Sequence, residues 1–196
     1  MPVCCLCTGL TIPALAQYNS GSGEAKETEF RIRAVDPRFI DTPDLSTGTF
    51  SRRGIVGGTP LKWLRVEVEF DSTPPWADTV ETRWYVLVAT EKKPVVFTAS
   101  VTHINVKRGL RHVSVIFVPP RTVDRYEMTT TRTRQISVQL LHDQKLVDTA
   151  SWRSEPKGRW WEDFTPVPGY MLNLLQTPFG VLEYDRYEQI KVSPTP

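Results

Sequence analysis

The sequence predicts a mainly β protein: an immunoglobulin-like antiparallel β-sandwich of about 7–9 strands with one short C-terminal helix. Two observations carry this prediction. Short apolar runs alternate with polar residues and are punctuated by Pro, Gly, Thr and Asp, as in half-buried strands joined by turns. Val, Thr and aromatic residues dominate these runs, and they are strand formers. A β-barrel of similar size is the alternative architecture.

Composition limits the classes of function. The chain has 196 residues, with 24 Lys+Arg against 22 Asp+Glu, so its net charge of +2 provides no strong overall attraction for nucleic acid or an anionic membrane. Hydrophobic residues make up 40% and charged residues 23%, which is ordinary for a globular protein. The length fits one domain with a large core. The sequence contains no apolar run of about 20 residues, so it predicts no membrane-spanning helix.

Residues 1–16 have the character of a signal peptide. The stretch 3–16 is uncharged and mostly apolar or small, and it ends Ala14-Leu15-Ala16, which a signal peptidase can cleave before Gln17. No Lys or Arg precedes this stretch, which an upstream translation start would explain. A buried N-terminal strand or helix is the alternative. Cleavage would remove all three cysteines, Cys4, Cys5 and Cys7, and leave an exported chain without disulfides.

The remaining chain divides into a flexible polar leader at 17–27 and a single sandwich domain at 28–196. The predicted strands are residues 28–35, 64–70, 83–90, 95–106, 112–118, 129–141 and 145–152. Between them we expect a long loop at 36–60 with an edge strand near 49–53, a loop at 71–80, a hairpin loop at 106–111 and a turn at 142–144. A helix is predicted at 169–176, and residues 180–192 fit either a strand or a helix.

No catalytic motif is present in the sequence. It lacks G-x-S-x-G, both common glycine-rich phosphate loops and the H-E-x-x-H metal motif. Residues 55–58 read IVGG, as at the start of trypsin-like proteases, but the serine and histidine contexts of those enzymes are missing. Glu162-Asp163 is the nearest pair of carboxylates, and adjacent positions do not make a glycosidase cleft. The sequence therefore predicts no enzyme activity, no cofactor and no metal site.

Two histidines offer a weaker hypothesis. His103 and His112 lie in predicted neighbouring strands on either side of the 106–111 loop, so they could approach each other across the hairpin. Two imidazoles without a third ligand do not define a metal site, and satisfied structural or surface histidines are the usual case.

Six residues form the candidate binding surface. Aromatic side chains could stack on sugar rings or anchor a protein contact, and the arginines could bind an acidic glycan or a protein. The competing interpretation is that the paired tryptophans close one end of the core and that the arginines protect a polar edge strand. These residues are Trp76, Arg132, Arg134, Trp160, Trp161 and Tyr170.

Two segments, LKWLRVEVEFDSTPPWADTVETRWYVLVAT at 61–90 and TPFGVLEYDRYEQIKV at 177–192, carry a resemblance. With the A-x-A leader, they look like the pilus-like, type IV pilus-associated exported β-sandwich proteins of mucin-degrading gut bacteria. The resemblance implies an immunoglobulin-like fold similar to archaeal pilins and a non-catalytic surface or periplasmic role. Nothing after Ala16 matches the long apolar helix that a true pilin keeps, so an accessory role is expected rather than a filament subunit.

The resulting hypothesis is an exported Gram-negative protein of the periplasm, outer surface or medium. It would act through contacts with pilus or envelope proteins, or through adhesion to host glycans. The alternative is a carbohydrate-binding module that uses exposed tryptophans as stacking platforms, with Trp160, Trp161 and Trp76 as the candidates. No nucleic-acid partner and no transmembrane segment are expected.

Overall fold

The computed structural model describes residues 29–43, 45–47, 50–52, 55–56, 59–91, 93–153, 158–183 and 185–192. The predicted leader segments 1–16 and 17–27 lie outside these residues. The elements in chain order are β1 (Phe30–Asp41), β2 (Leu45–Thr47), β3 (Phe50–Arg52), β4 (Ile55–Val56), β5 (Thr59–Pro60), β6 (Lys62–Val88), β7 (Val95–Val118), α1 (Pro120–Arg125), β8 (Thr133–His142), β9 (Lys145–Trp152), η1 (Trp160–Asp163), β10 (Val167–Pro168), β11 (Leu172–Asn173), η2 (Leu174–Gln176) and η3 (Pro178–Val181).

One long antiparallel ribbon dominates the fold. β6 and β7 pair from Leu64 opposite Val118 to Val88 opposite Val95. The predicted loop at 71–80 and the predicted hairpin loop at 106–111 are therefore wrong, because both strands continue through them. Proline and glycine at these positions mark a bend in the ribbon instead of the end of a strand.

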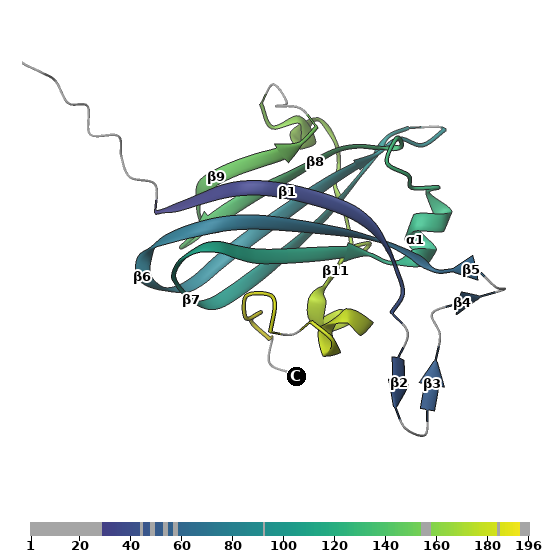
Figure 1. Cartoon of the computed structure of the whole chain (residues 1–196). Helices are drawn as coiled ribbons and strands as arrows, with labels where there is room; N and C mark the ends of the chain where they lie inside the picture. The colour runs from purple at the N-terminus through teal and green to yellow at the C-terminus, as the bar shows by residue number, and fades with distance from the viewer. Residues whose placement is uncertain are drawn as a thin grey trace, which may run out of the picture.

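The bend has a definite construction, and we call residues 71–77 of β6 and 106–112 of β7 the corner. The register shifts between Phe70 and Ser72 and again between Ser72 and Trp76, so each strand carries extra residues at a different point. Such bulges sharpen the local bend and twist of a sheet. The corner lies at the left end of the molecule in Figure 1.

Because the ribbon bends, each of its strands belongs to two layers. The first layer contains β1, the first part of β6, the second part of β7 and β11. The second layer contains β9, β8, the second part of β6, the first part of β7 and β10. The predicted mainly β sandwich is confirmed, with both layers drawn from one continuous seven-stranded sheet (Figure 1).

The core fills the space between the layers. Alternate residues of β6 point inward, and Leu64, Val66, Val68 and Phe70 are buried as the alternation predicts. They join buried residues of the second layer in one hydrophobic cluster, among them Trp84, Val86, Ile136, Val138 and Leu140.

The C-terminal segment covers the outer face of the first layer. Phe179 of η3 packs against Trp63 and Phe117, with ring centroids 5.6 and 4.9 Å apart respectively. The predicted helix at 169–176 is wrong in place, because this range holds β11 and η2, while the one α-helix among the described residues is α1. Residues 185–191, which we call the strap, then run along β7. There Ile104 N–H donates to the Gln189 carbonyl and Lys191 N–H to the Thr102 carbonyl.

Local patterns account well for the β8–β9 hairpin. β9 has the predicted bounds, and its two-residue turn at Asp143 and Gln144 has φ angles of 49° and 63°. Positive φ at both central positions is the geometry that matches the twist of a tight hairpin. Part of the predicted loop at 36–60 is structured, since β1 extends to Asp41 and β3 pairs with β2 where an edge strand was expected. Within the described residues, no helix has the length and hydrophobicity needed to cross a bilayer.

Candidate functional site

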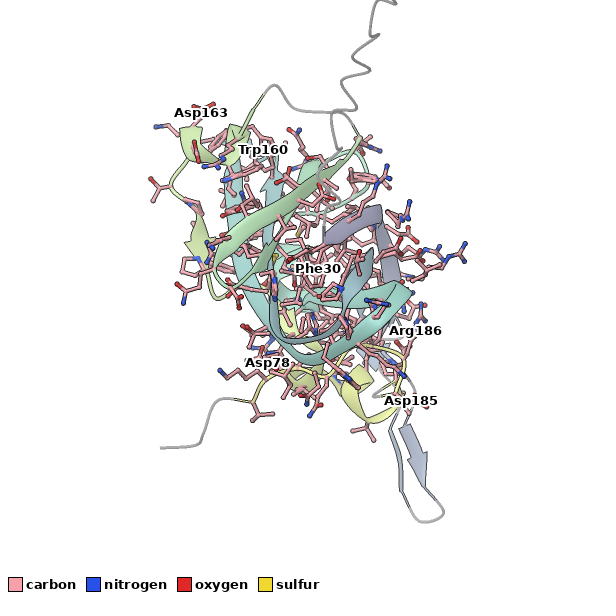
Figure 2. The ribbon with its side chains drawn as sticks, turned by 90° about the vertical axis from the view of Figure 1, so that its left-hand side faces the viewer. Phe30, Asp78, Trp160, Asp163, Asp185 and Arg186 are labelled. Carbon is pink, nitrogen blue, oxygen red and sulfur yellow. The ribbon has the colours of Figure 1, made fainter. Side chains whose placement is uncertain are left out.

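The tryptophan pair predicted at the binding surface is buried. Trp160 and Trp161 are 9% and 5% exposed, in a small cluster with Val96. Trp161 stacks on Tyr85 with centroids 4.6 Å apart, and the indole N–H of Trp160 donates to Ser137 Oγ at 2.7 Å. The segment that begins at Trp160 thus caps the outer face of the second layer, where Figure 2 labels Trp160, and both rings are buried.

Two of the other candidates, Arg132 and Tyr170, lie near the hairpin that joins β6 to β7. This hairpin is at the end of β6 that belongs to the second layer. Arg132 forms an ion pair with Glu127 at 2.8 Å. Tyr170 stacks on Phe97 and also meets Tyr126 edge-on, with centroids 5.0 and 5.9 Å apart. Arg134 lies on the backbone of β8, and its side chain falls outside the described part of the structure.

A surface pocket connects Arg132 and Tyr126, and we call it the hairpin-end pocket. It has a volume of about 430 Å³. Its lining combines cationic, anionic and aromatic side chains, and the residues are Thr90, Glu91, Val95, Arg125, Tyr126, Glu127 and Arg132. Arg125 and Tyr126 were not among the predicted site residues, because no helix was predicted where α1 lies. Pro120 in its first turn was the available signal.

The remaining candidate, Trp76, lies at the corner and is apart from this pocket. Its side chain is 62% exposed, and Lys107 Nζ lies 6.0 Å from the ring centroid. The six predicted residues therefore do not form one surface. Arg132 and Tyr170 share the hairpin end through Tyr126. The tryptophan pair is buried in a separate cluster on the outer face of the second layer, and Trp76 stands alone.

A buried polar chain near the corner includes a serine–histidine pair. His103 Nε2 lies 2.7 Å from Ser114 Oγ, and His103 Nδ1 lies 3.3 Å from the Glu188 carbonyl oxygen. A carbonyl can only accept, so Nδ1 carries the proton and Nε2 accepts from the serine. Thr82 Oγ1 lies 3.0 Å from Ser114 Oγ and 3.3 Å from the Val101 carbonyl oxygen, and it accepts the indole N–H of Trp84.

This pair resembles a nucleophile and its base, but its surroundings exclude that use. His103 is 1% exposed and Ser114 is fully buried, so no substrate reaches them. Burial lowers the pKa of His103 to about 4, and a backbone carbonyl occupies the place where a triad has a carboxylate. The chain of hydrogen bonds instead satisfies polar groups between the two layers.

The second histidine joins the same strap from outside the core. His112 Nδ1 lies 2.7 Å from Glu188 Oε1, and this contact raises the pKa of His112. The two histidines lie on one strand and not across a hairpin, and Glu188 is what connects them. The described residues contain no group of three or more His, Cys, Asp or Glu side chains that could hold a metal ion.

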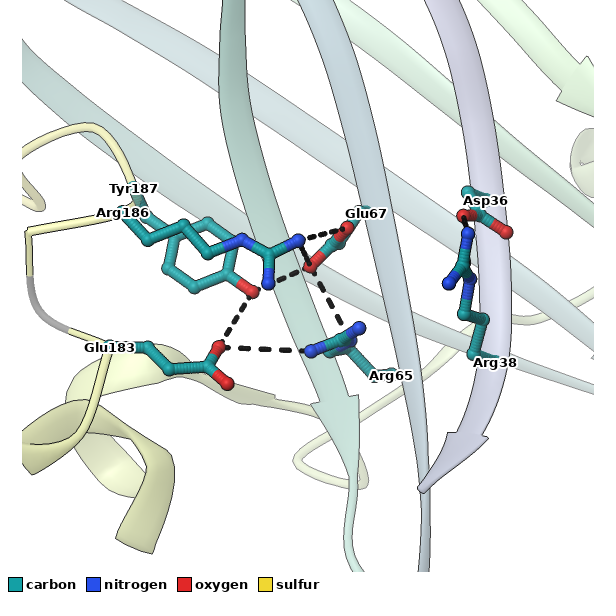
Figure 3. Close-up of polar contacts among 7 residues, drawn as sticks. All are labelled: Asp36, Arg38, Arg65, Glu67, Glu183, Arg186 and Tyr187. Carbon is teal, nitrogen blue, oxygen red and sulfur yellow. Dashed lines mark hydrogen bonds and ion pairs between the residues drawn. The ribbon is translucent and has the colours of Figure 1, made fainter.

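A cluster of charged groups fixes the beginning of the strap to the first layer (Figure 3). The Tyr187 hydroxyl donates to Glu67 Oε1 at 2.6 Å, and Arg186 contacts the same carboxylate at 3.0 Å. Arg65 lies 3.4 Å from Glu67 and 3.7 Å from Glu183. Two arginines thus balance two glutamates. Burial together with Glu67 raises the pKa of Tyr187.

The sequence does not predict this cluster, because the alternation in residues 64–70 puts Arg65 and Glu67 on the polar face of the strand, which is expected to face solvent. The structure buries Glu67 under the strap. The alternation shows which face a residue occupies, but not whether another segment covers that face.

Comparison with known proteins supports the fold and shows the family. A protein-family model matches residues 21–194, nearly the whole chain. A crystal structure of a protein from Akkermansia muciniphila superposes with a TM-score of 0.72 at 21% identity, covering 84% of this chain and 94% of that one. No curated protein sequence matches. Because the family match spans almost the entire chain, the protein belongs to this family of pilus-associated β-sandwich proteins.

Proposed function

We propose that the protein is exported and that it acts without catalysis, through contacts with pilus or envelope proteins. The family match over residues 21–194 is the observation that carries this proposal. The buried state of the serine–histidine pair supports it, because this is the arrangement in the described residues that most resembles catalytic machinery. The signal-peptide character of residues 1–16 supports export.

The hairpin-end pocket is the contact site that we favour. Trp, Tyr and Arg side chains are enriched among the residues that dominate binding energy at protein interfaces, and this pocket is lined by Tyr126, Arg125 and Arg132. The ion pair of Arg132 with Glu127 holds one guanidinium at the rim. A partner segment that carries a carboxylate and an apolar side chain would satisfy both kinds of group.

Fractionation and crosslinking test the proposal. Envelope and pilus material is isolated from cells, and N-terminal sequencing of the protein in that material is expected to begin at Gln17. A retained Met1 would contradict processing, and absence from both materials would contradict the function. For the site, Arg132→Glu is expected to reduce crosslinking to pilus components. Lys145→Glu, at the exposed β8–β9 turn, is the matched control that should leave it unchanged.

A carbohydrate-binding role is the second candidate, and the exposed indole of Trp76 is the observation that favours it. Trp160 and Trp161 cannot serve as platforms while buried. A glycan array with the wild-type protein and Trp76→Ala tests this role. Binding that disappears in the variant supports it, and no binding, or binding that persists in the variant, removes it.

A further inference from the structure

The corner is a projecting edge that exposes large apolar side chains. Trp76 is 62% exposed, and Leu110, on the opposite strand of the ribbon, is 77% exposed. Leu110 lies within a register shift and has no cross-strand partner, whereas Trp76 comes directly after the second shift and pairs with Lys107. Figure 2 looks directly at this end of the molecule, where the bent ribbon faces the viewer.

Hydrogen bonds made by neighbouring residues fix the backbone of the bulges, and this backbone holds the Trp76 and Leu110 side chains outward. Arg111 has φ of 60°, and its backbone N–H donates to Asp71 Oδ1 at 3.0 Å. Across the ribbon, Arg108 Nε donates to the Thr73 carbonyl at 2.5 Å. The backbone of the corner is therefore fixed by polar contacts, and exposure of the two apolar side chains is built into its geometry.

Three cations surround the two apolar side chains. Lys107, Arg108 and Arg111 are exposed, and none of them forms an ion pair with another described residue. The nearby acids offset this charge only in part. Asp71 is buried against Arg33. Asp78, the residue that follows the corner on β6, is exposed. The net charge of +2 for the whole chain conceals this local excess of positive charge.

We propose that the corner docks the protein on an anionic lipid bilayer. Indole and leucine side chains enter the headgroup boundary, while lysine and arginine contact the phosphates at the same depth. Each cation near an anionic surface contributes roughly 1 kcal/mol. A sugar platform would use the indole but would give Leu110 no role. This inference does not depend on the proposed pilus contacts, which use the other end of the ribbon.

Vesicle sedimentation tests the proposal with the protein in its processed form. The probes are vesicles of pure phosphatidylcholine and vesicles of three parts phosphatidylcholine to one part phosphatidylglycerol. Binding is expected only to the anionic vesicles and should weaken in high salt. The double variant Lys107→Gln/Arg108→Gln should bind about 25-fold more weakly, and Trp76→Ala about tenfold more weakly. The matched control is Lys145→Gln/Arg121→Gln, which removes two exposed cations elsewhere and should bind like wild type.

Fluorescence provides an independent readout. Among the six tryptophans, Trp76 is the exposed one, since four are buried and Trp152 is half-buried. Vesicle binding should shift the emission to shorter wavelength in the wild type and not in Trp76→Phe. The proposal is overturned if anionic vesicles do not sediment the protein, if the control variant loses as much binding as the corner variants, or if only a soluble sulfated polysaccharide binds. None of these outcomes would affect association with pili.

Discussion

His103 shows how a single side chain can tie layers together and limit stability at low pH. It is buried, and its pKa is lowered to about 4, while an unfolded histidine titrates near 6.5. As the pH falls below about 6.5, the unfolded chain binds the proton more readily than the folded protein does. Stability is therefore lost between about pH 6.5 and pH 4, by roughly 3 kcal/mol at most.

His112 changes the pH dependence of stability in the opposite direction from His103. Its pKa is raised, first by the hydrogen bond to Glu188 and against a smaller opposing effect of burial. The stabilisation that it contributes is fully present below about pH 6.5 and is lost as the pH rises through its folded pKa. We expect the ring resonance of His103 in proton NMR to stay constant from about pH 8 to about pH 5, and that of His112 to titrate above about pH 6.5. His112→Gln and His142→Gln together assign the three histidine signals, and a His103 that titrates near neutrality would contradict the structure.

Ser137 is the residue on which the burial of Trp160 depends. Its hydroxyl accepts the Trp160 indole N–H and also contacts Ser151 Oγ at 2.6 Å. Ser137→Ala leaves a buried indole N–H without a partner, and we expect a loss of about 1–3 kcal/mol in the free energy of unfolding. Urea unfolding measures it. Ser151→Ala is the control, because Trp160 keeps its acceptor there, and an equal loss in both variants would contradict this role.

At the scale of elements, the strap is a segment without regular structure that polar contacts hold against β6 and β7. Its hydrogen bonds to β7 are few, so the side chains of Arg186, Tyr187 and Glu188 supply much of its attachment. The carboxylate of Glu67 lies beneath it and needs these partners, because an unpaired buried charge is costly.

Removing one hydroxyl tests that attachment. Tyr187→Phe deletes the bond to Glu67 while keeping the ring, and a hydrogen bond to a charged group contributes about 1.5–3 kcal/mol. We expect destabilisation of that order in urea unfolding and faster amide exchange in residues 185–191. Tyr85→Phe is the matched control, since its hydroxyl lies 3.4 Å from Gln139 and should contribute little. Unchanged exchange in Tyr187→Phe would show that the strap is held by other contacts.

Elements also show where sequence reasoning succeeds and where it stops. Lys145–Trp152 was predicted within its observed bounds, because period-two alternation and a tight turn are local properties. The ribbon was predicted as four strands, because Pro74, Pro75 and Gly109 are residues that usually end strands. These residues interrupt the hydrogen-bond ladder at the corner as they would at a loop. Only the pairing register with the partner strand distinguishes a bend in a continuous ribbon from a loop between two strands.

At the scale of the whole molecule, the bent ribbon joins the two layers in two ways. The strands β6 and β7 run covalently from one layer into the other, and the hydrogen-bonded pairing between them continues through both. β6 contributes to both layers, and so does β7, so neither layer can lose its structure without disrupting the other. We expect a single cooperative unfolding transition in urea, with coincident curves from far-ultraviolet circular dichroism and tryptophan fluorescence. The tryptophans occupy both layers, with Trp63 in the first and Trp84 in the second, so the fluorescence reports on each. Two separate transitions would contradict the continuity of the ribbon.

The candidate site was only partly accessible from the sequence. Arg132 and Tyr170 were chosen as residue types, and the structure brings them near Tyr126. Their neighbours could not be predicted, because α1 and the hairpin end are adjacent in space but not in sequence. Trp160 and Trp161 showed the limit of composition: an aromatic pair fits a core or a surface equally well until the opposing face is known.

Local sequence patterns predict the class of fold and the alternation of buried and exposed residues along the strands, because these properties depend on residues that are neighbours in the chain. Tertiary structure alone decided that strands continue through a corner, that the C-terminal strap covers Glu67, and that Trp76 is exposed while Trp160 is buried. Those outcomes depend on which distant segments pack together. Such packing is set by the free energy of the whole chain and is not contained in any local pattern.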